Sequence, residues 1–454
     1  MDINEYIDKV YNGKIDWFAD EVEQSYNIAR ISNVLGYKNY LNGVHNILKK
    51  SDMKYKEELF ITRKLVIQEC RTILNFHSTY LLGKPLSLTG TENMVKEFEK
   101  VYRKGCYNDI DFRLNDKMAK FGDSYEYVYL EGKKIKSKII DSAEGYPVFS
   151  EDNLYVAFIE HWCINGIYYY IVYYENEVQE WNNEGANVKL NMTSSYPNCS
   201  GLPICYHNFN DSDDNFGTSL IKDIRPILDE IEDLLSKMGD SIYTLSLNPL
   251  LVSIGQPIVG SLSADGVGYC VGLEMGSDLK YVSATMDYNT IKLYLDTLGQ
   301  KLNMVSHMPS IVSGGNIANV SEVSLKLLYQ LADVLAMLSE KCMVKGITQR
   351  FEIFEKLLVS QGITFNEDDY VSVSFNYSRP QNMTELLDNL TKQFNMGAIS
   401  MRTIIEKSPL TTDVAQELFR IKEEEDSLNL DDVETDIIDT TDTQIEGELD
   451  VPTK

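Results

Sequence analysis

The chain has 454 residues, a hydrophobic content of 43% and a net charge of −27. This length corresponds to about three domains of average size, and the hydrophobic residues are numerous enough to fill their cores. The surplus of acidic residues excludes a protein that holds nucleic acid by neutralising its phosphates, because such binding requires a basic surface.

Seven cysteines are dispersed without any C-x-x-C pair. This pattern indicates neither a disulfide framework nor a zinc site and fits a reducing cytoplasm. The first residues, MDINEYIDKVYNGK, lack the apolar run of a signal peptide. Residues 241–264 carry no charge, but Pro249 and Pro257 interrupt them, so we predict a helix-to-strand passage there and no membrane span.

Residues 1–56 are predicted to form a polar helical arm, with a turn at Asn42 and Gly43. Apolar residues recur at helical spacing over residues 57–82, and the sequence Gly83-Lys84-Pro85 predicts the end of this helix. Between residues 121 and 181 the period changes to two, which predicts antiparallel strands with a hairpin turn at Asn165-Gly166.

A run of tyrosines accompanies these strands: Tyr168, Tyr169, Tyr170, Tyr173 and Tyr174. Such rings stack on bases in some single-strand-binding proteins. No lysine or arginine interleaves with them here, so we interpret them as cross-strand aromatic pairs.

Apolar residues from Leu220 to Leu245 recur at helical spacing and predict a helix of about 28 residues. The other face of this helix is acidic, which we interpret as a solvated face. Residues 249–287 are short strands broken by glycines, and a second helical pattern runs from Ile291 to Val305. We therefore predict a stalk of two antiparallel helices that carries a small β module at its tip.

Residues 308–320 (MPSIVSGGNIANV) have no helix or strand pattern and are predicted to be a mobile loop. Asn319 and Glu322 then resemble a capping box that opens a helix of about forty residues, with a bend expected at Gly346. A strand over residues 370–377 and three short helices, over residues 384–396, 401–407 and 413–425, follow. The remaining residues are mostly acids and threonines, which predicts disorder.

No nucleotide-binding, metalloprotease or serine-hydrolase motif is present in the sequence, and the five histidines do not pair at ligand spacing. His161 lies in a strand pattern beside Cys163, and we interpret it as structural. The acidic loop over residues 210–215 lacks the glycine and glutamate of an EF-hand. We expect no enzyme, no cofactor and no metal. A hydrolase with paired carboxylates is the enzymatic alternative, but no such pair stands out.

Several short motifs occur in a specific order. They are YLNGVH at residues 40–45, LGKP at 82–85, FGDSY at 121–125, GTSL at 217–220 and GAIS at 397–400. Together with the order of the predicted elements, they resemble the portal proteins of tailed bacteriophages, in the branch common among phages of Gram-positive hosts. The resemblance extends over residues 37–425. It implies an α+β portal fold that assembles into a ring, usually a dodecamer, at one capsid vertex.

The resemblance implies a division of the chain into the parts of a portal subunit. These are an N-terminal arm (1–56), a wing (57–207), a first stem helix region (208–247), a clip (248–287), a second stem helix (288–307), a tunnel loop (308–320), a long kinked helix with a strand that returns to the wing (321–382), a crown (383–425) and a disordered acidic tail (426–454).

The resemblance also implies a head-tail connector through which double-stranded DNA is packaged and ejected. An acidic wall suits this task, because it repels DNA and lets the duplex slide. For the tunnel loop we expect Ser313, Gly314, Gly315, Asn316 and Ile317 to meet the DNA. Candidates for lining the channel are Asp223, Glu230, Asp233, Asp240, Lys292 and Lys301, with solvent exposure or ion pairs between subunits as the alternatives.

The expected partners are further copies of the chain, the packaging terminase, the head-completion adaptor, and capsid and scaffold proteins. The terminase and the adaptor are expected to bind the clip, through Gln256, Asp265, Glu274, Asp278 and Lys280. The expected location is the portal vertex of the virion, after assembly in the host cytoplasm. A structural ring or adaptor of a phage-derived particle that does not translocate DNA is the alternative function.

Overall fold

The computed structural model describes residues 2–55, 58–185, 189–242, 250–255, 274–282, 287–309, 322–380, 383–408, 411, 414 and 416–423. The chain divides into two compact units, one made of residues 1–312 with 328–379 and the other of residues 313–327 with 380–454. Helices and antiparallel sheets both contribute to the first unit, so the fold is α+β as predicted.

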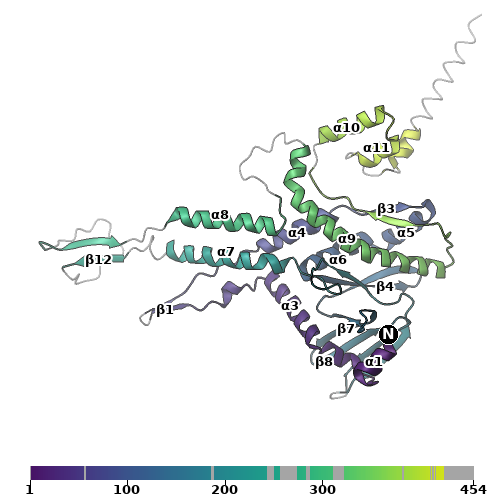
Figure 1. Ribbon diagram of the computed structural model, residues 1–454, viewed down its shortest axis with the longest axis horizontal. Helices are drawn as coiled ribbons and strands as arrows, with labels where there is room; N and C mark the ends of the chain where they lie inside the picture. The colour runs from purple at the N-terminus through teal and green to yellow at the C-terminus, as the bar shows by residue number, and fades with distance from the viewer. Residues whose placement is uncertain are drawn as a thin grey trace, which may run out of the picture. The chain divides into compact units, whose positions relative to one another are not determined.

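A five-stranded antiparallel sheet follows the order β10-β9-β8-β7-β6; its strands β7 and β8 are labelled in Figure 1. Its strands are β6 (Gly145–Phe149), β7 (Tyr155–Ile164), β8 (Ile167–Tyr173), β9 (Glu177–Asn182) and β10 (Asn191–Pro197). Between β7 and β8, Asn165 and Gly166 both have positive φ, 53° and 79°. Two successive positive φ values are typical of the predicted hairpin turn, which is confirmed.

Both faces of this sheet are covered. Ile159 and Val172 contact the N-terminal helices through Trp17 and Phe18, whereas the alternate residues, such as Phe158, lie in another core with the three-stranded sheet β11-β4-β5. The N-terminal elements are α1 (Ile3–Tyr11), α2 (Trp17–Val22), α3 (Ser25–Leu41) and the 3₁₀ helix η1 (Asn46–Lys49); the strands are β4 (Asp123–Glu131), β5 (Lys134–Ile140) and β11 (Ile204–His207). Part of the predicted polar arm therefore packs against the five-stranded sheet.

The tyrosines of β8 pair across strands, as predicted. Tyr169 lies opposite Trp162, and their rings stack with centroids 5.5 Å apart. Tyr170 and Tyr173 are buried. His161 is also satisfied within the sheet, since its Nδ1 lies 3.0 Å from the carbonyl oxygen of Tyr169 and burial lowers its pKa.

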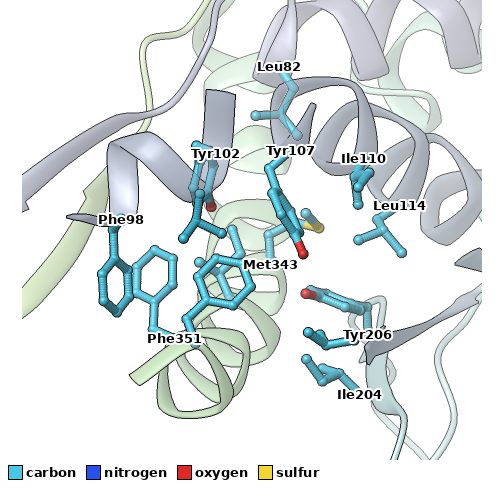
Figure 2. Packing of buried hydrophobic residues seen from close by; sticks show 14 of the residues in the cluster. Leu82, Phe98, Tyr102, Tyr107, Ile110, Leu114, Ile204, Tyr206, Met343 and Phe351 are labelled. Atoms are coloured by element: carbon cyan, nitrogen blue, oxygen red, sulfur yellow. The ribbon is translucent and has the colours of Figure 1, made fainter. Parts of the chain in front are cut away.

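The largest core lies between α9 and the helices α5 and α6 (Figure 2). The ring of Phe98 on α5 meets that of Phe351 on α9 edge to face, with centroids 5.3 Å apart. These elements are α5 (Glu92–Gly105), α6 (Tyr107–Phe121) and α9 (Glu322–Ser360), with strands β3 (Ser87–Gly90) and β14 (Val371–Ser374) paired beside them. The long helix is confirmed at 39 residues.

An ion cluster is buried in this core. Arg350 of α9 donates from Nε to Glu126 (2.9 Å) and from Nη1 to Asp111 (2.5 Å), and all three side chains are at most 1% exposed. Two carboxylates share one guanidinium, so the cluster carries a surplus negative charge when all are ionised. Burial raises the pKa of Asp111 to about 6, although Arg350 opposes this rise. The cluster fixes α9 to both α6 and β4.

The predicted helix over residues 57–82 is wrong in its first half. Strands β1 (Met53–Tyr55) and β2 (Glu58–Phe60) form a hairpin, residues 61–68 are irregular, and only α4 (Glu69–Leu82) is helical. Ile61 is 79% exposed, whereas Cys70 and Leu74 are buried. The helical spacing of apolar residues was thus misleading before Glu69, because a tertiary contact described below uses the backbone N–H groups of residues 63–67.

The predicted stalk is present. Helix α7 (Ile221–Ser241) lies beside α8 (Tyr288–Val305) (Figure 1). Strands β12 (Leu250–Ile254) and β13 (Asp278–Val282), which lie between these helices in the sequence, pair antiparallel. The predicted continuation of α7 to Leu245 lies outside the described residues. None of the helices in the described ranges is long and apolar enough to cross a membrane.

The second unit contains α10 (Met383–Asn395) and α11 (Met401–Lys407), which contact each other. Gly397 has the positive φ, 70°, of a helix-ending residue, and Ser400 caps α11 by accepting a hydrogen bond from the Thr403 N–H. Residues 416–423 are helical. Residues 310–320 of the loop predicted over 308–320 lie outside the described residues, as do the predicted capping residue Asn319 and the predicted acidic tail.

Gly346 has a packing requirement. A Cβ atom added there would lie 2.2 Å from the ring of Tyr206, and α9 is continuous through this position. We expect Gly346→Ala to lower the free energy of unfolding by about 1–3 kcal/mol, the usual cost of overpacking, in urea denaturation. Gly299→Ala on α8 is the control, because nothing lies within 4 Å of its added Cβ. The control should be neutral or stabilising; equal destabilisation of both variants would contradict the packing argument.

Candidate functional site

The stalk helix α7 is held by an extended segment, residues 61–67, which we call the strap. The backbone N–H groups of Arg63, Leu65 and Ile67 donate to the side chains of Asp240 (3.1 Å), Ser236 (3.0 Å) and Glu232 (2.7 Å), respectively. N–H groups of strap residues two apart in sequence thus hydrogen-bond to side chains of α7 that are four residues apart. Two extended residues advance about 6.6 Å and four helical residues about 6 Å, so the two repeats match.

The Glu232 carboxylate is the buried end of this contact. Its Oε1 also accepts from Nδ1 of His45 at 2.7 Å, and both side chains are at most 1% exposed. The imidazole of His45 stacks on the ring of Tyr40, with centroids 3.9 Å apart. Gly43, with a φ of 89°, makes the turn that brings His45 back from α3. The YLNGVH motif therefore builds the turn that anchors α7.

Two further motifs meet where α7 begins. Gly122 and Gly217 approach each other so closely that neither position has room for a side chain. A Cβ atom added to Gly122 would lie 2.4 Å from the carbonyl oxygen of Gly217, and a Cβ atom added to Gly217 would lie 2.2 Å from the carbonyl oxygen of Gly122. Asp123 accepts from the Gly217 N–H (2.7 Å) and from Nδ1 of His207 (2.8 Å). Burial alone would lower the pKa of His207, but the hydrogen bond and charge of Asp123 raise it to about 10. The FGDSY and GTSL motifs thus join the sheet to the stalk.

The end of α8 is fixed at the same base. Nε2 of the buried His77, on α4, donates to the carbonyl oxygen of Ser306 at 2.6 Å, and burial lowers the pKa of His77 to about 4. A neutral imidazole therefore caps this helix end. Leu298 and Leu302 of α8 lie in one core with Leu228 and Ile231 of α7.

The four acids predicted to line a channel fall on two sides of α7. At 100° per residue, Asp223 and Glu230 lie about 20° apart, whereas Asp233 and Asp240 lie about 80° to 100° from Asp223. Asp223 and Glu230 are exposed, and Tyr294 of α8 donates to Glu230 at 3.3 Å. Asp240 accepts from the strap.

Asp233 is bound by two lysines. Lys50 donates to its Oδ1, and Lys237 lies 2.9 Å from its Oδ2. Burial works against ionisation of Asp233, but the hydrogen bonds from both lysines lower its pKa. Much of the acidic face that we interpreted as solvated is therefore covered by His45, Lys50 and the strap.

The two stalk lysines diverge. Lys292 and Lys301 are both exposed, but nine residues of α-helix place them about 180° apart around α8. The two cannot point in one direction from the same helix. At the tip, Asp278 and Lys280 lie two residues apart on β13, with their charged atoms 4.0 Å apart, and Glu274 is exposed before the strand. Gln256, Asp265 and residues 313–317 lie outside the described residues.

The sequence alone did not single out the residues that fix the stalk. Glu232 and Glu230 belong to the same acidic pattern on α7, yet one is buried and the other exposed. The available signal was their spacing, since Glu232, Ser236 and Asp240 recur every four residues. For His45, Asp123 and Gly217, the signal was their place in the family motifs.

Comparison with known proteins agrees with this architecture. The model of the family "Phage portal protein, SPP1 Gp6-like" matches residues 21–429, and the chain belongs to this family. The portal protein of Bacillus phage SPP1 is 23% identical over 376 residues, which make up 76% of this chain and 73% of that protein.

Two solved structures of a gene transfer agent (GTA) particle are also similar. The neck of the empty GTA particle computed with C6 symmetry contains a chain with 11% identity and a TM-score of 0.48, covering 73% of this chain and 86% of that one. The neck of the native GTA particle computed with C12 symmetry has 12% identity and a TM-score of 0.45, covering 74% and 88%.

The anchoring role of Glu232 can be tested directly. Glu232→Ala removes the acceptor of two donors, the Ile67 N–H and Nδ1 of His45, and an unsatisfied buried donor costs about 1–3 kcal/mol. We expect the free energy of unfolding in urea to fall by about 2–4 kcal/mol. Glu230→Ala, two residues away and exposed, should change it by less than about 0.5 kcal/mol. Equal losses in the two variants would contradict the anchor.

Proposed function

We propose that identical copies of this chain form the portal ring at one vertex of a phage capsid, through which double-stranded DNA is packaged and ejected. Family membership over residues 21–429 carries this proposal. Portal proteins are structural components of the virion rather than enzymes. A ring closes when one heterologous contact repeats around an axis, and twelve copies is the number we propose.

The parts of the portal subunit are assigned as follows in this proposal. The sheets with α5 and α6 form the wing, α7 and α8 the stem, and the hairpin β12–β13 belongs to the clip. Residues 308–320 form the tunnel loop, α10 and α11 belong to the crown, and α9 is the long helix that precedes the strand returning to the wing. The stalk with its hairpin tip, fixed at its base by Asp123, His77 and Glu232, supports this assignment.

The charge of the stem suits passage of a duplex. Asp223 and Glu230 form an exposed acidic stripe on α7, in a chain with a net charge of −27. Phosphates near such a stripe are repelled, so DNA moves along it without being held. We propose that this stripe faces the channel, that Asp233 serves chiefly to bind Lys50, and that Asp240 serves chiefly to hold the strap. At most one of Lys292 and Lys301 faces the channel in this proposal.

The tip is proposed as the docking site for other proteins of the particle. The exposed residues Glu274, Asp278 and Lys280, together with Gln256 and Asp265, would bind the terminase during packaging and the head-completion adaptor afterwards. Capsid and scaffold proteins would surround the wing, and assembly would take place in the host cytoplasm.

Electron microscopy of the purified protein tests the ring. We expect top views with a central opening wide enough for a DNA duplex, about 20 Å, and a mass by light scattering close to that of twelve copies. Monomers at high concentration would contradict the proposal. A closed ring without such an opening would favour the alternative, a structural ring that does not translocate DNA.

Charge reversal tests the acidic channel. Rings of the double variant Asp223→Lys/Glu230→Lys should retain duplex DNA at low salt in a filter-binding assay, and the retention should fall steeply as salt rises, because lysine–phosphate contacts release counterions. Wild-type rings should retain little.

The matched control is Glu92→Lys/Glu99→Lys, which makes the same charge change on two exposed residues of α5, also seven apart. Retention by this control equal to that of the stem variant would show that net charge alone, and not the stem stripe, governs contact with DNA.

A further inference from the structure

A single guanidinium serves two carboxylates in the core between α9, α6 and β4. The side chains of Arg350, Asp111 and Glu126 are at most 1% exposed. An unpaired charge in a protein interior is so costly that the group commonly changes its protonation state instead. Because one positive charge faces two groups that can each become negative, we expect this cluster to bind a proton more readily than carboxylic acids in water do.

The hydrogen bonds indicate which of the two carboxylates holds that proton. Oε2 of Glu126 accepts from Nε of Arg350 at 2.9 Å and from the Tyr206 hydroxyl at 2.6 Å. Oδ1 of Asp111 accepts from Nη1 of Arg350; its Oδ2, like Oε1 of Glu126, is buried without a hydrogen-bond partner among the described residues. Donors stabilise the ionised form of a carboxyl group. Glu126 has more of them, so Asp111 is the better place for the proton.

The tyrosines and the arginine around Asp111 keep their charge state near neutral pH. Three rings labelled in Figure 2 face the cluster, those of Tyr102 from α5, Tyr107 from α6 and Tyr206 from β11. Burial raises the pKa of each of these phenols, so all three stay neutral. Burial works against the charge of Arg350, but the two carboxylates hold its pKa well above its ordinary value. The Tyr102 hydroxyl lowers the pKa of Asp111, although less than burial raises it.

A surface pocket of about 300 Å³ lies against the turn of α6 that carries Asp111. Asn108 and Asp109 of the same turn also line it, together with Gly83 and Lys84 at the end of α4. The charged residues of its rim, Lys84 and Asp109, are exposed. Solvent therefore comes close to Asp111 although its side chain is buried, and a proton can exchange there without unfolding of the core.

We propose that Asp111 binds a proton in the folded chain in mildly acidic solution and releases it as the pH rises, so that α9 is held more firmly at acidic than at alkaline pH. This inference concerns the core of one subunit and does not depend on the ring. The ordinary pKa of the carboxyl group is 3.8, and burial raises that of Asp111 to about 6 in the folded chain. The added stability is therefore complete below the lower value and is lost as the pH rises through the higher one.

A pH series of urea unfolding tests the proton. Asp111→Asn removes the ionisable group and keeps a carbonyl oxygen for Arg350. Between about pH 5 and about pH 8, we expect the unfolding equilibrium constant of the wild type to rise about tenfold relative to that of this variant. Tryptophan fluorescence at one protein concentration is the readout, because all three tryptophans lie in the unit that contains the cluster. The control is Asp109→Asn, at an exposed position of α6, which should keep the wild-type profile.

Infrared spectroscopy detects the proton itself. The folded wild type should show a carboxylic-acid C=O band that fades with a midpoint near pH 6, and Asp111→Asn should lack this band. Glu126→Gln is the second variant: one carboxylate then faces one guanidinium, so the band should disappear there too. An unchanged band in either variant, or equal pH dependence of unfolding in the wild type and Asp111→Asn, would overturn the inference. Should Asp111→Asn fail to fold, the band in Glu126→Gln decides in its place.

Discussion

The stalk depends on one interaction, the pairing of strap N–H groups with side chains of α7. A two-helix stalk has little core of its own, because α7 and α8 share only one apolar seam. The strap supplies what the seam lacks, because three consecutive contacts fix the rotation of α7 about its axis. Sliding the strap by one residue would present carbonyl groups in place of N–H groups to Asp240, Ser236 and Glu232, leaving the buried Glu232 without its donor.

A similar constraint fixes α9. Its Arg350 is fully buried between Asp111 and Glu126, and displacing the helix by one turn would leave two carboxylates in the core without a cation. Breaking such a cluster costs about 3–5 kcal/mol, whereas an apolar seam tolerates small shifts. The longest helices of the chain are thus each positioned by buried polar contacts to segments far away in sequence. In a ring, every subunit repeats the same contact, so a small displacement of a helix in each subunit would add up around the circle. Fixing each helix by buried polar contacts limits this displacement.

Periodicity was enough to predict α7, α8 and α9, because each buries one apolar stripe along its whole length. It failed at Ile61 and Leu65, which share that spacing but lie in a segment whose backbone is bound by α7, about 170 residues later in the chain. Residues 86–120 received no prediction, although Met94, Phe98 and Val101 carried a helical signal that α5 confirms. At the site, the acidic pattern of α7 does not distinguish buried Glu232 from exposed Glu230, and the four-residue spacing of Glu232, Ser236 and Asp240 gains its meaning only from the strap that binds these residues.

The distribution of charge around the stem reconciles assembly with DNA passage. At physiological ionic strength, charges interact appreciably only within a Debye length of about 8 Å, so repulsion between copies depends on the groups close to their contact and little on the net charge of −27. Lys50 and the strap neutralise or cover Asp233 and Asp240 on one flank of α7. The carboxylates that stay exposed, those of Asp223 and Glu230, lie on another side of α7. In the proposed ring this side remains free for the channel, where a phosphate within a Debye length meets unscreened negative charge. In the proposed ring, the same strap that fixes α7 therefore determines which of its acids remain exposed to the DNA.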